Sequence, residues 1–392
     1  MSISSTFYNI LMFRLYLYYQ IDFFTDEGFQ LDLDVESNLR TLHVVKCLAG
    51  NSSAFIDEWE FGFKSILVNA PLDSNLHVHI IADADATKAI HERIEKNKLT
   101  ESVWRNEVTV TVNNVEDLLP SWRSFLTQSL TNESNRNWMD RRVGIGAYFR
   151  LFAHRVIMPY ECKDDTTCTD FKKRDLEEAV YMDTDVVIIA NLNHLIHTTE
   201  KTLVKAKEEG LQRPIWIWNL NSGFIVLDLT RFEQMWELVA KMPSIANNDE
   251  RKKGDQWLLA KVQEKHTSVA AKLPDEWSTH VGHGFRREPQ KLLDSGRDAG
   301  MLHFTAPDSF GANFMDRGGT DKWCHRSKGC KGDDTAPGSD MDKVRRSWGL
   351  AEYYAKLSWD WAFYQGGRSR LRPGEEGHVL QYVKRISRPE EL

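Results

Sequence analysis

Apolar residues along this chain gather in short runs that alternate with longer segments of helical spacing. The short runs predict strands at 41–48, 76–82, 107–112, 179–183, 215–218, 224–229 and 299–304. Apolar residues spaced three and four apart predict helices at 55–68, 87–96, 142–158, 230–240, 255–264 and 343–363. Strands and helices alternate through the first two thirds of the chain. The pattern therefore predicts an α/β fold, a Rossmann-like, mostly parallel sheet with helices on both faces.

Two carboxylates, Asp183 and Asp185, stand where the run 179–183 ends and the apolar run 186–189 begins. Because side chains alternate along a strand, we expect both to project from one face. Ligands of parallel sheets bind at the carboxyl ends of strands, and two carboxylates there suit Mg²⁺ or Mn²⁺. A diphosphate is a natural further partner for such a cation. The arrangement therefore favours a nucleotide-sugar enzyme over a hydrolase.

An Asp-x-Asp triplet is a short signal, and the chain contains a second one. Asp83 and Asp85 follow the run 76–82. We expect one of these carboxylates to cap the helix that begins near Thr87.

Composition bounds the size and the partners of the protein. The 392 residues, 41% of them hydrophobic, suffice for one large α/β domain with insertions or for two small domains. The formal net charge is −7, so no basic excess is available to hold a phosphate backbone. We therefore expect no nucleic-acid partner.

Four of the five cysteines form two Cys-x5-Cys pairs, Cys162 with Cys168 and Cys324 with Cys330. Zinc sites usually have tighter spacing, so local disulfides fit these pairs better and favour an oxidising compartment. The sequons at Asn51 and Asn132 agree with a secretory location. The fifth cysteine, Cys47, lies in an apolar strand and is expected to be a reduced core residue.

The N-terminal segment 7–24 is mostly apolar but contains Arg14, Gln20 and Asp22. A bilayer centre tolerates such residues poorly, so the segment is a substandard membrane span. We favour a remnant of a membrane anchor over an amphipathic helix.

Several motifs occur in one order along the chain. They are Ala147-Tyr148-Phe149-Arg150-Leu151, the run from Tyr181 to Asp185, the run from Leu220 to Leu229, the run from Gly254 to Leu259, and Leu302-His303-Phe304. Across residues 41–305 this order resembles glycosyltransferase family 8. The family comprises retaining enzymes that include glycogenin, bacterial lipopolysaccharide galactosyltransferases, and glucoside and xyloside xylosyltransferases.

The resemblance implies a single GT-A domain that uses a UDP-sugar and Mn²⁺, with Mg²⁺ as the alternative ion. We place that domain at residues 41–320. Residues 1–40 would then form the hydrophobic segment and a link, and residues 321–392 a C-terminal extension on the acceptor side or in packing. The expected acceptor is a glycan or glycoprotein. The expected location is the lumen of the Golgi or endoplasmic reticulum, in the manner of a type II membrane protein.

The resemblance also assigns the metal ligands. By position, Asp183 and Asp185 match the family's metal-binding acidic motif, and His303 matches its third protein ligand. A nitrogen donor is softer than oxygen, which suits Mn²⁺ better than Mg²⁺. Asp83 and Asp85 follow the wrong strand for the family metal.

Other matched positions imply contacts with the donor and roles in the reaction. The donor-binding set is Leu48 and Ala49 for uracil and ribose, Arg150 and Asp183 for the diphosphate or sugar, and Asn221, Ser222 and Gly223 for the sugar. Asp255 and Gln256 match the family's Asp-Gln pair near the anomeric centre. An amide is a poor nucleophile, so the resemblance favours a front-face mechanism, with Asp255 as a rival nucleophile. Arg142 and Arg155 are alternatives to Arg150 if the helix register shifts.

One departure from the family lies after His303. The family's Lys-Pro-Trp cluster, whose lysine touches the diphosphate, is absent, and the first lysine that follows is Lys322. A UDP-sugar-binding homologue without catalysis is therefore the main alternative function, and a metal-dependent phosphohydrolase is a third. In the C-terminal third, Trp348, Trp359 and Trp361 could stack against an acceptor, although core packing is the favoured role for each.

Overall fold

The computed structural model describes residues 40–71, 74–97, 108–118, 146–157, 176–210, 212–240, 255–281, 300–304, 351, 353–359 and 362. The chain divides between Leu39 and Arg40, and every described residue belongs to the unit that begins at Arg40. Some predictions fall outside the described residues: the N-terminal segment, both cysteine pairs, Asn132, Arg142, Lys322, Trp348 and Trp361. The expected domain limits also stay predictions. Among the described residues, no helix has both the length and the apolar character needed to cross a membrane.

Seven strands form the main sheet, in the order β3-β2-β1-β4-β7-β6-β8. They are β1 (Arg40–Leu48), β2 (Ser74–Ala82), β3 (Val108–Asn114), β4 (Glu178–Met182), β6 (Trp216–Trp218), β7 (Phe224–Asp228) and β8 (Ala270–Lys272). Among the strands that the structure describes in this sheet, only β7 runs antiparallel to its neighbours, and every other pairing is parallel. The predicted mostly parallel α/β sheet is confirmed.

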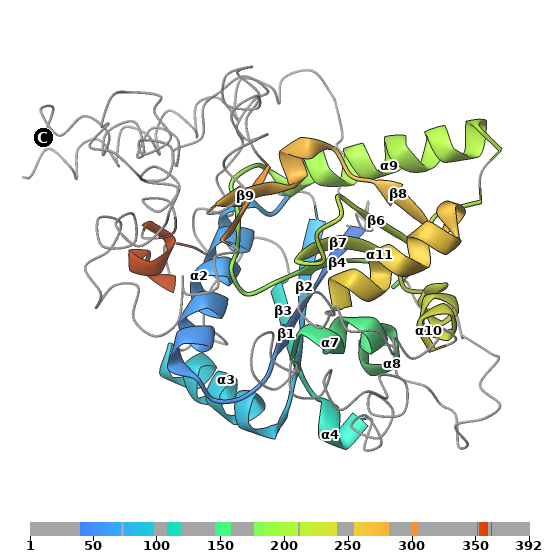
Figure 1. Cartoon of the computed structure of the whole chain (residues 1–392). Helices are drawn as coiled ribbons and strands as arrows, with labels where there is room; N and C mark the ends of the chain where they lie inside the picture. Colours follow the sequence, from blue (N-terminus) through green and yellow to red (C-terminus); the bar gives the residue numbers. More distant parts are fainter. Residues whose placement is uncertain are drawn as a thin grey trace, which may run out of the picture. The chain divides into compact units, whose positions relative to one another are not determined.

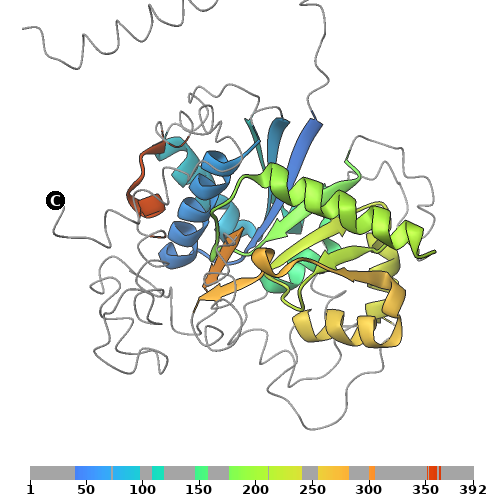
Figure 2. The ribbon, with the colours of Figure 1, turned by 90° about the horizontal axis from the view of Figure 1, so that it is seen from above.

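Helices cover both faces of this sheet (Figures 1 and 2). One face carries α2 (Ser53–Asn69), α3 (Ala84–Lys96) and α9 (Leu192–Glu208). The other carries α7 (Gly146–Phe149), the 3-10 turn η3 (Arg150–Phe152), α8 (Ala153–Ile157), α10 (Phe232–Ala240) and α11 (Asp255–Lys265). Alternation along β1 separates the two cores, because Val44 packs with the first layer and Val45 with the second. Burying one such side chain contributes roughly 1.5–3 kcal/mol.

A second, three-stranded sheet has the order β5-β10-β9. Its strands are β5 (Val186–Ile188), β9 (Thr279–Val281) and β10 (Met301–Phe304). Strand β10 pairs antiparallel with β5 and parallel with β9. Three short helical segments complete the described elements. The 3-10 turn η5 (Thr267–Val269) precedes β8, the 3-10 turn η6 (Asp275–Trp277) precedes β9, and α4 (Val115–Leu118) follows β3. This small sheet brings β10, and with it His303, to the end of β4.

The acidic triplet is a turn, so the expected strand geometry at Asp183 and Asp185 is wrong. Strand β4 ends at Met182, and the N–H of Val186 donates to the Asp183 carbonyl at 3.3 Å. The chain has to leave the main sheet here and enter β5 of the second sheet. A tight turn makes that change of direction, and both carboxylates still reach one place because of the turn.

The long helix predicted at 142–158 is interrupted where it is described. Residues 146–157 form α7, η3 and α8 in succession. The Ala147 carbonyl, which would accept the N–H of residue 151 in a regular α-helix, accepts Nε–H of Arg150 at 2.7 Å. The tighter turn directs the Arg150 side chain toward the sheet.

The described C-terminal residues pack against α2 (Figure 1). Residues 351 and 353–356 are helical, in line with the predicted helix at 343–363. Trp359 is 7% exposed, and its ring centroid lies 5.5 Å from that of Phe63 and 6.2 Å from that of Trp59. Core packing, the favoured role for this tryptophan, is confirmed.

Candidate active site at the acidic turn

Three potential cation ligands converge at the turn between β4 and β5. The ligand atoms of Asp183, Asp185 and His303 all lie within 4.8 Å of one another. Nε2 of His303 lies 3.1 Å from Oδ1 of Asp185 and 3.8 Å from Oδ2 of Asp183. Neighbouring ligands of an octahedral ion with bonds of about 2.1 Å lie about 3 Å apart. The three residues therefore fit a divalent cation with mixed oxygen and nitrogen ligands.

Electrostatics at this group also fit a cation. His303 is buried, and burial alone lowers the pKa of its ring. The carboxylates of Asp185 and Asp183 outweigh burial, so the pKa of His303 rises above its usual value. The site thus favours positive charge, which a bound divalent cation also supplies.

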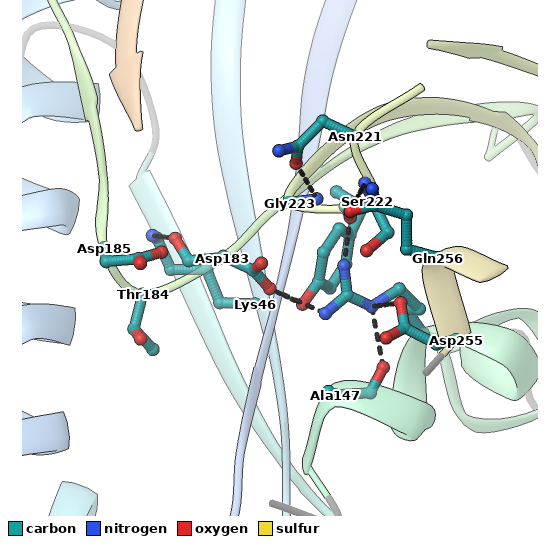
Figure 3. Close-up of polar contacts among 12 residues, drawn as sticks. Lys46, Ala147, Asp183, Thr184, Asp185, Asn221, Ser222, Gly223, Asp255 and Gln256 are labelled. Carbon is teal, nitrogen blue, oxygen red and sulfur yellow. Dashed lines mark hydrogen bonds and ion pairs between the residues drawn. The ribbon is translucent and has the colours of Figure 1, made fainter. Parts of the chain in front are cut away.

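Asp183 is held from both faces of the sheet (Figure 3). From the α2 side, Nζ of Lys46 donates to the Asp183 carbonyl at 3.0 Å. From the α7 side, Nη2 of Arg150 donates to Oδ1 at 2.8 Å, and the Tyr181 hydroxyl donates to the same oxygen. Oδ1 is therefore engaged by protein donors, while Oδ2 is directed toward His303.

Arg150 joins the separate parts of the site. It is buried, its Nη1 donates to the Ser222 carbonyl, and its Nε lies 3.1 Å from Oδ2 of Asp255. Its guanidinium carbon lies 4.2 Å from the centre of the Tyr181 ring. Burial would lower the pKa of Arg150, but Asp183 and Asp255 raise it, so the side chain is a permanent cation. These contacts are all to protein groups, and the expected contact with the donor phosphate stays a prediction.

The turn from Asn221 to Gly223 packs directly on the ligand group. Oδ1 of Asn221 accepts the Gly223 N–H at 2.6 Å, and the Gly223 carbonyl accepts the Asp183 N–H at 2.7 Å. A Cβ on Gly223 would lie 2.1 Å from Cε1 of His303 and 2.7 Å from Oδ2 of Asp183. Only glycine fits this position. Leu220, just before the turn, is 61% exposed and has φ of +53°, a conformation that costs a leucine energy.

Asp255 and Gln256 begin α11 beside this turn (Figure 3). Asp255 is 3% exposed, and burial raises the pKa of its carboxyl although Arg150 opposes the rise. Gln256 is exposed, and its Oε1 accepts the Ser222 N–H at 3.4 Å. The amide is therefore the accessible member of the pair, and the carboxylate is the enclosed one.

Leu48 and Ala49 lie at the carboxyl end of β1. A Cβ on Gly146, the first residue of α7, would lie 3.1 Å from the Ala49 backbone nitrogen. These two residues therefore border α7, which directly precedes the turn η3 that carries Arg150. Contact with a nucleotide at Leu48 and Ala49 stays a prediction.

The second acidic triplet has the structural role expected of it. Oδ1 of Asp83 accepts the Ala86 N–H at 2.9 Å and caps α3, and both carboxylate oxygens accept the Gly50 N–H. Asp85 is exposed in the first turn of the same helix. Neither belongs to a metal-binding group among the described residues.

Two charged residues beneath the acidic turn were not predicted from the sequence. Lys46 is fully buried, and burial lowers its pKa to about 8. Burial, followed by the charge of Asp185, raises the pKa of Glu58, whose Oε2 accepts the Thr184 hydroxyl at 3.1 Å. A Cβ on Gly62 would lie 3.0 Å from the Thr184 carbonyl and 3.1 Å from Nζ of Lys46. The only available signal was a lone lysine within an apolar strand.

No protein-family model matches this sequence, and no curated protein matches it. The chain resembles glycosyltransferases of known structure. Mouse xyloside xylosyltransferase 1 is 10% identical with a TM-score of 0.44, over 68% of this chain and 98% of that one. GlyE of Streptococcus pneumoniae TIGR4 is 11% identical with a TM-score of 0.45, over 83% of this chain and 63% of that one.

A third similar structure is the galactosyltransferase LgtC in complex with donor and acceptor sugar analogs. It is 12% identical with a TM-score of 0.37, over 68% of this chain and 88% of that one. At TM-scores below 0.5, a function has to rest on the geometry of the site itself.

Proposed function

We propose that this chain is a retaining glycosyltransferase that transfers a hexose or pentose from a UDP-sugar to a glycan or glycoprotein. The observation that carries the proposal is the convergence of Asp183, Asp185 and His303 within 4.8 Å, beside a turn of amide and hydroxyl groups. The ligand group suits a diphosphate-bound cation, and the turn suits sugar hydroxyls.

The donor set favours Mn²⁺ over Mg²⁺ because His303 supplies a nitrogen. When bound, the cation would neutralise the diphosphate charge that develops as UDP leaves. Asp183 would offer Oδ2 to it, because Arg150 and Tyr181 already hold Oδ1. Arg150 would thus act as a positioning residue for Asp183 and for the Ser222 carbonyl.

The arrangement of Asp255 and Gln256 favours a front-face mechanism. A double displacement needs a carboxylate that can reach the anomeric carbon. Asp255 is 3% exposed and paired with Arg150, whereas the exposed side chain is the amide of Gln256. We propose that Asp255 fixes Arg150 and the Ser222 turn, and that Gln256 faces the donor sugar. The acceptor then attacks from the side that UDP leaves, and a phosphate oxygen takes its proton.

We also propose a luminal location, in the Golgi or endoplasmic reticulum. The two Cys-x5-Cys pairs and the sequons support it. Mass spectrometry of unreduced peptides from the native source should find Cys162–Cys168 and Cys324–Cys330 bridges. Free thiols at all four positions would count against this location.

A donor panel tests the activity. Purified protein is incubated with each UDP-sugar, with Mn²⁺ or EDTA and with or without a glycan acceptor, and UDP release is measured. We expect one donor to give Mn²⁺-dependent UDP release that an acceptor accelerates. UDP binding with no turnover of any donor would favour the silent homologue, and cleavage of a donor to UMP and a sugar phosphate without an acceptor, followed in the same mixtures, would favour a phosphohydrolase.

A further inference from the structure

A second group of metal-binding side chains lies on the main sheet, away from the acidic turn. His43 belongs to β1, and His77 and His79 belong to β2. The parallel register places His43 opposite His77, and His79 lies two residues further along the same face. The His-x-His pair on β2 and the third histidine on the neighbouring strand β1 therefore bring their ring nitrogens to one place.

The three imidazoles are in close contact. One ring nitrogen from each residue lies within 4.8 Å of the other two. Nδ1 of His43 lies 3.0 Å from Nε2 of His79, and the ring centroids of His77 and His79 are 3.8 Å apart. His79 is 4% exposed, whereas His43 and His77 are half-buried and leave the group open to an entering ion.

We propose that His43, His77 and His79 form a binding site for one transition-metal ion, with Zn²⁺ preferred. Zinc bound to three imidazoles has Zn–N bonds of about 2.0–2.1 Å, so tetrahedral nitrogens lie about 3.3 Å apart. The 3.0 Å between the nitrogens of His43 and His79 is close to that spacing. A water molecule takes the fourth position. The rings of His77 and His79 are stacked at an interplanar angle of 26°, and two stacked rings do not direct their lone pairs at one ion. They therefore rotate about Cβ–Cγ as the ion replaces the hydrogen bond between His43 and His79.

The surroundings of the three rings support a metal site of this kind. The Thr111 hydroxyl on β3 lies 2.7 Å from Nε2 of His77, the position of a partner that orients a metal-bound imidazole. Burial lowers the pKa of His43 to about 4 and that of His79 to about 2, so both rings are neutral at physiological pH. Neutral rings have the lone pair that a metal needs.

This site differs from the acidic site in place and in chemistry. Leu48 lies five positions beyond His43 along β1, a rise of about 16 Å at about 3.3 Å per residue. The acidic site offers two carboxylates and one imidazole, whereas this one offers three imidazoles and so selects a softer ion. An ion bound here ties two adjacent strands of the main sheet together. The proposal is independent of the proposed glycosyltransferase activity.

Cobalt serves as the probe, because tetrahedral Co²⁺ absorbs strongly in the visible and octahedral Co²⁺ does not. Full-length protein is stripped with EDTA and titrated with Co²⁺, and Zn²⁺ is then added as competitor. We expect one equivalent of tetrahedral Co²⁺, displaced by one equivalent of Zn²⁺. His79→Gln should bind at least tenfold more weakly, whereas His303→Gln, at the acidic site, should keep the tetrahedral spectrum.

A substitution that leaves all three ligands in place separates metal binding from folding. Thr111→Val should weaken Co²⁺ binding about ten- to a hundredfold, since it removes only the orienting hydroxyl. Thr202→Val on α9, which also loses a hydroxyl, should leave the affinity unchanged. A tetrahedral spectrum of equal affinity in wild type, His79→Gln and Thr111→Val would overturn the site, and so would its absence from folded wild type.

Discussion

At the scale of single residues, Asp183 divides its contacts among three oxygen atoms. Its carbonyl accepts from Lys46, its Oδ1 from Arg150 and Tyr181, and its Oδ2 is left to meet His303 and a cation. The carboxylate is therefore fixed before any ligand arrives. Such preorganisation keeps the cost of ordering the site out of the binding step.

Gly223→Ala tests how closely the Asn221–Gly223 turn packs on the ligands. The new Cβ would lie 2.1 Å from Cε1 of His303, so His303 has to move and Mn²⁺ affinity should fall at least tenfold. Isothermal titration with Mn²⁺ measures this. Gly210→Ala is the matched control. At φ of +69° the substitution costs about 1 kcal/mol of stability. Nothing lies within 4 Å of the added Cβ, so the Mn²⁺ affinity should be unchanged. Equal Mn²⁺ affinity in both variants would contradict the close approach.

Single residues of the site were predictable where they belong to a short sequence motif. Asp183, Asp185 and His303 were predicted because ordered motifs marked them, and the structure brings them together. Lys46 and Glu58 could not be predicted, because a charged residue in a strand or helix ordinarily indicates a solvent-facing position. Their burial depends on the packing of α2 against the turn after β4, which local sequence does not encode.

At the scale of elements, strands that coincide with an apolar run were predictable, even where they are as short as β6 and β10, and strands without such a run were not. Strands β1, β2, β4 and β7 were predicted within two residues of their observed ends. Strands β8 and β9 have three residues each, Ala-Ala-Lys and Thr-His-Val, and contain no run of large apolar residues by which they could be recognised. Helix α9 was missed because only Leu192, Leu195, Thr199 and Ala206 of its seventeen residues are buried, so its apolar stripe is sparse.

Glu233 joins two helices on one face of the sheet. On α10, its Oε2 lies 2.7 Å from Nε2 of His154 and accepts Nε–H of Arg155 at 2.9 Å, both on α8. Burial raises the pKa of Glu233, but His154 and Arg155 outweigh it and lower the pKa to about 2. Burial also lowers the pKa of His154, so we treat its ring as a neutral donor and Arg155 as the charged partner.

Glu233→Gln should therefore lower the free energy of unfolding by about 2 kcal/mol near neutral pH. The folded-state pKa is below the ordinary 4.5, so the stabilisation is complete above pH 4.5 and is lost as pH falls toward 2. Urea unfolding at several pH values should show that the difference in unfolding free energy between wild type and variant decreases below pH 4.5. Glu237 is exposed on the same helix, so Glu237→Gln should change the unfolding free energy only slightly. A difference in unfolding free energy for Glu233→Gln that does not change with pH would refute the ion pair.

At the scale of the whole molecule, the described C-terminal residues complete the core beside α2. Tyr354, Leu357, Trp359 and Ala362 are buried in the same core as Val44 of β1 and Val186 of β5. The Tyr354 hydroxyl lies 3.1 Å from Nδ2 of Asn69 at the end of α2. These residues belong to the extension predicted at 321–392, for which packing was one of the two expected roles, and they pack against α2.

Trp359→Ala separates core packing from acceptor stacking. Removing this buried ring from contact with Trp59 and Phe63 should cost about 3–5 kcal/mol of unfolding free energy. Trp257→Ala, at a half-buried ring on α11, should cost less. Urea unfolding compares the two. Unchanged stability in Trp359→Ala, together with a higher acceptor KM, would instead indicate a stacking surface.

The most direct test of the account is whether a cation at the acidic turn binds a nucleoside diphosphate. Isothermal titration calorimetry measures the affinity for UDP in the presence of Mn²⁺ and in the presence of EDTA. The titration is made with wild type, Asp185→Asn and Asp85→Asn. We predict Mn²⁺-dependent UDP binding in wild type and in Asp85→Asn, whose aspartate lies exposed on α3, and at least a hundredfold loss in Asp185→Asn. UDP affinity that is unaffected by EDTA, or that is the same in the two variants, would contradict the account.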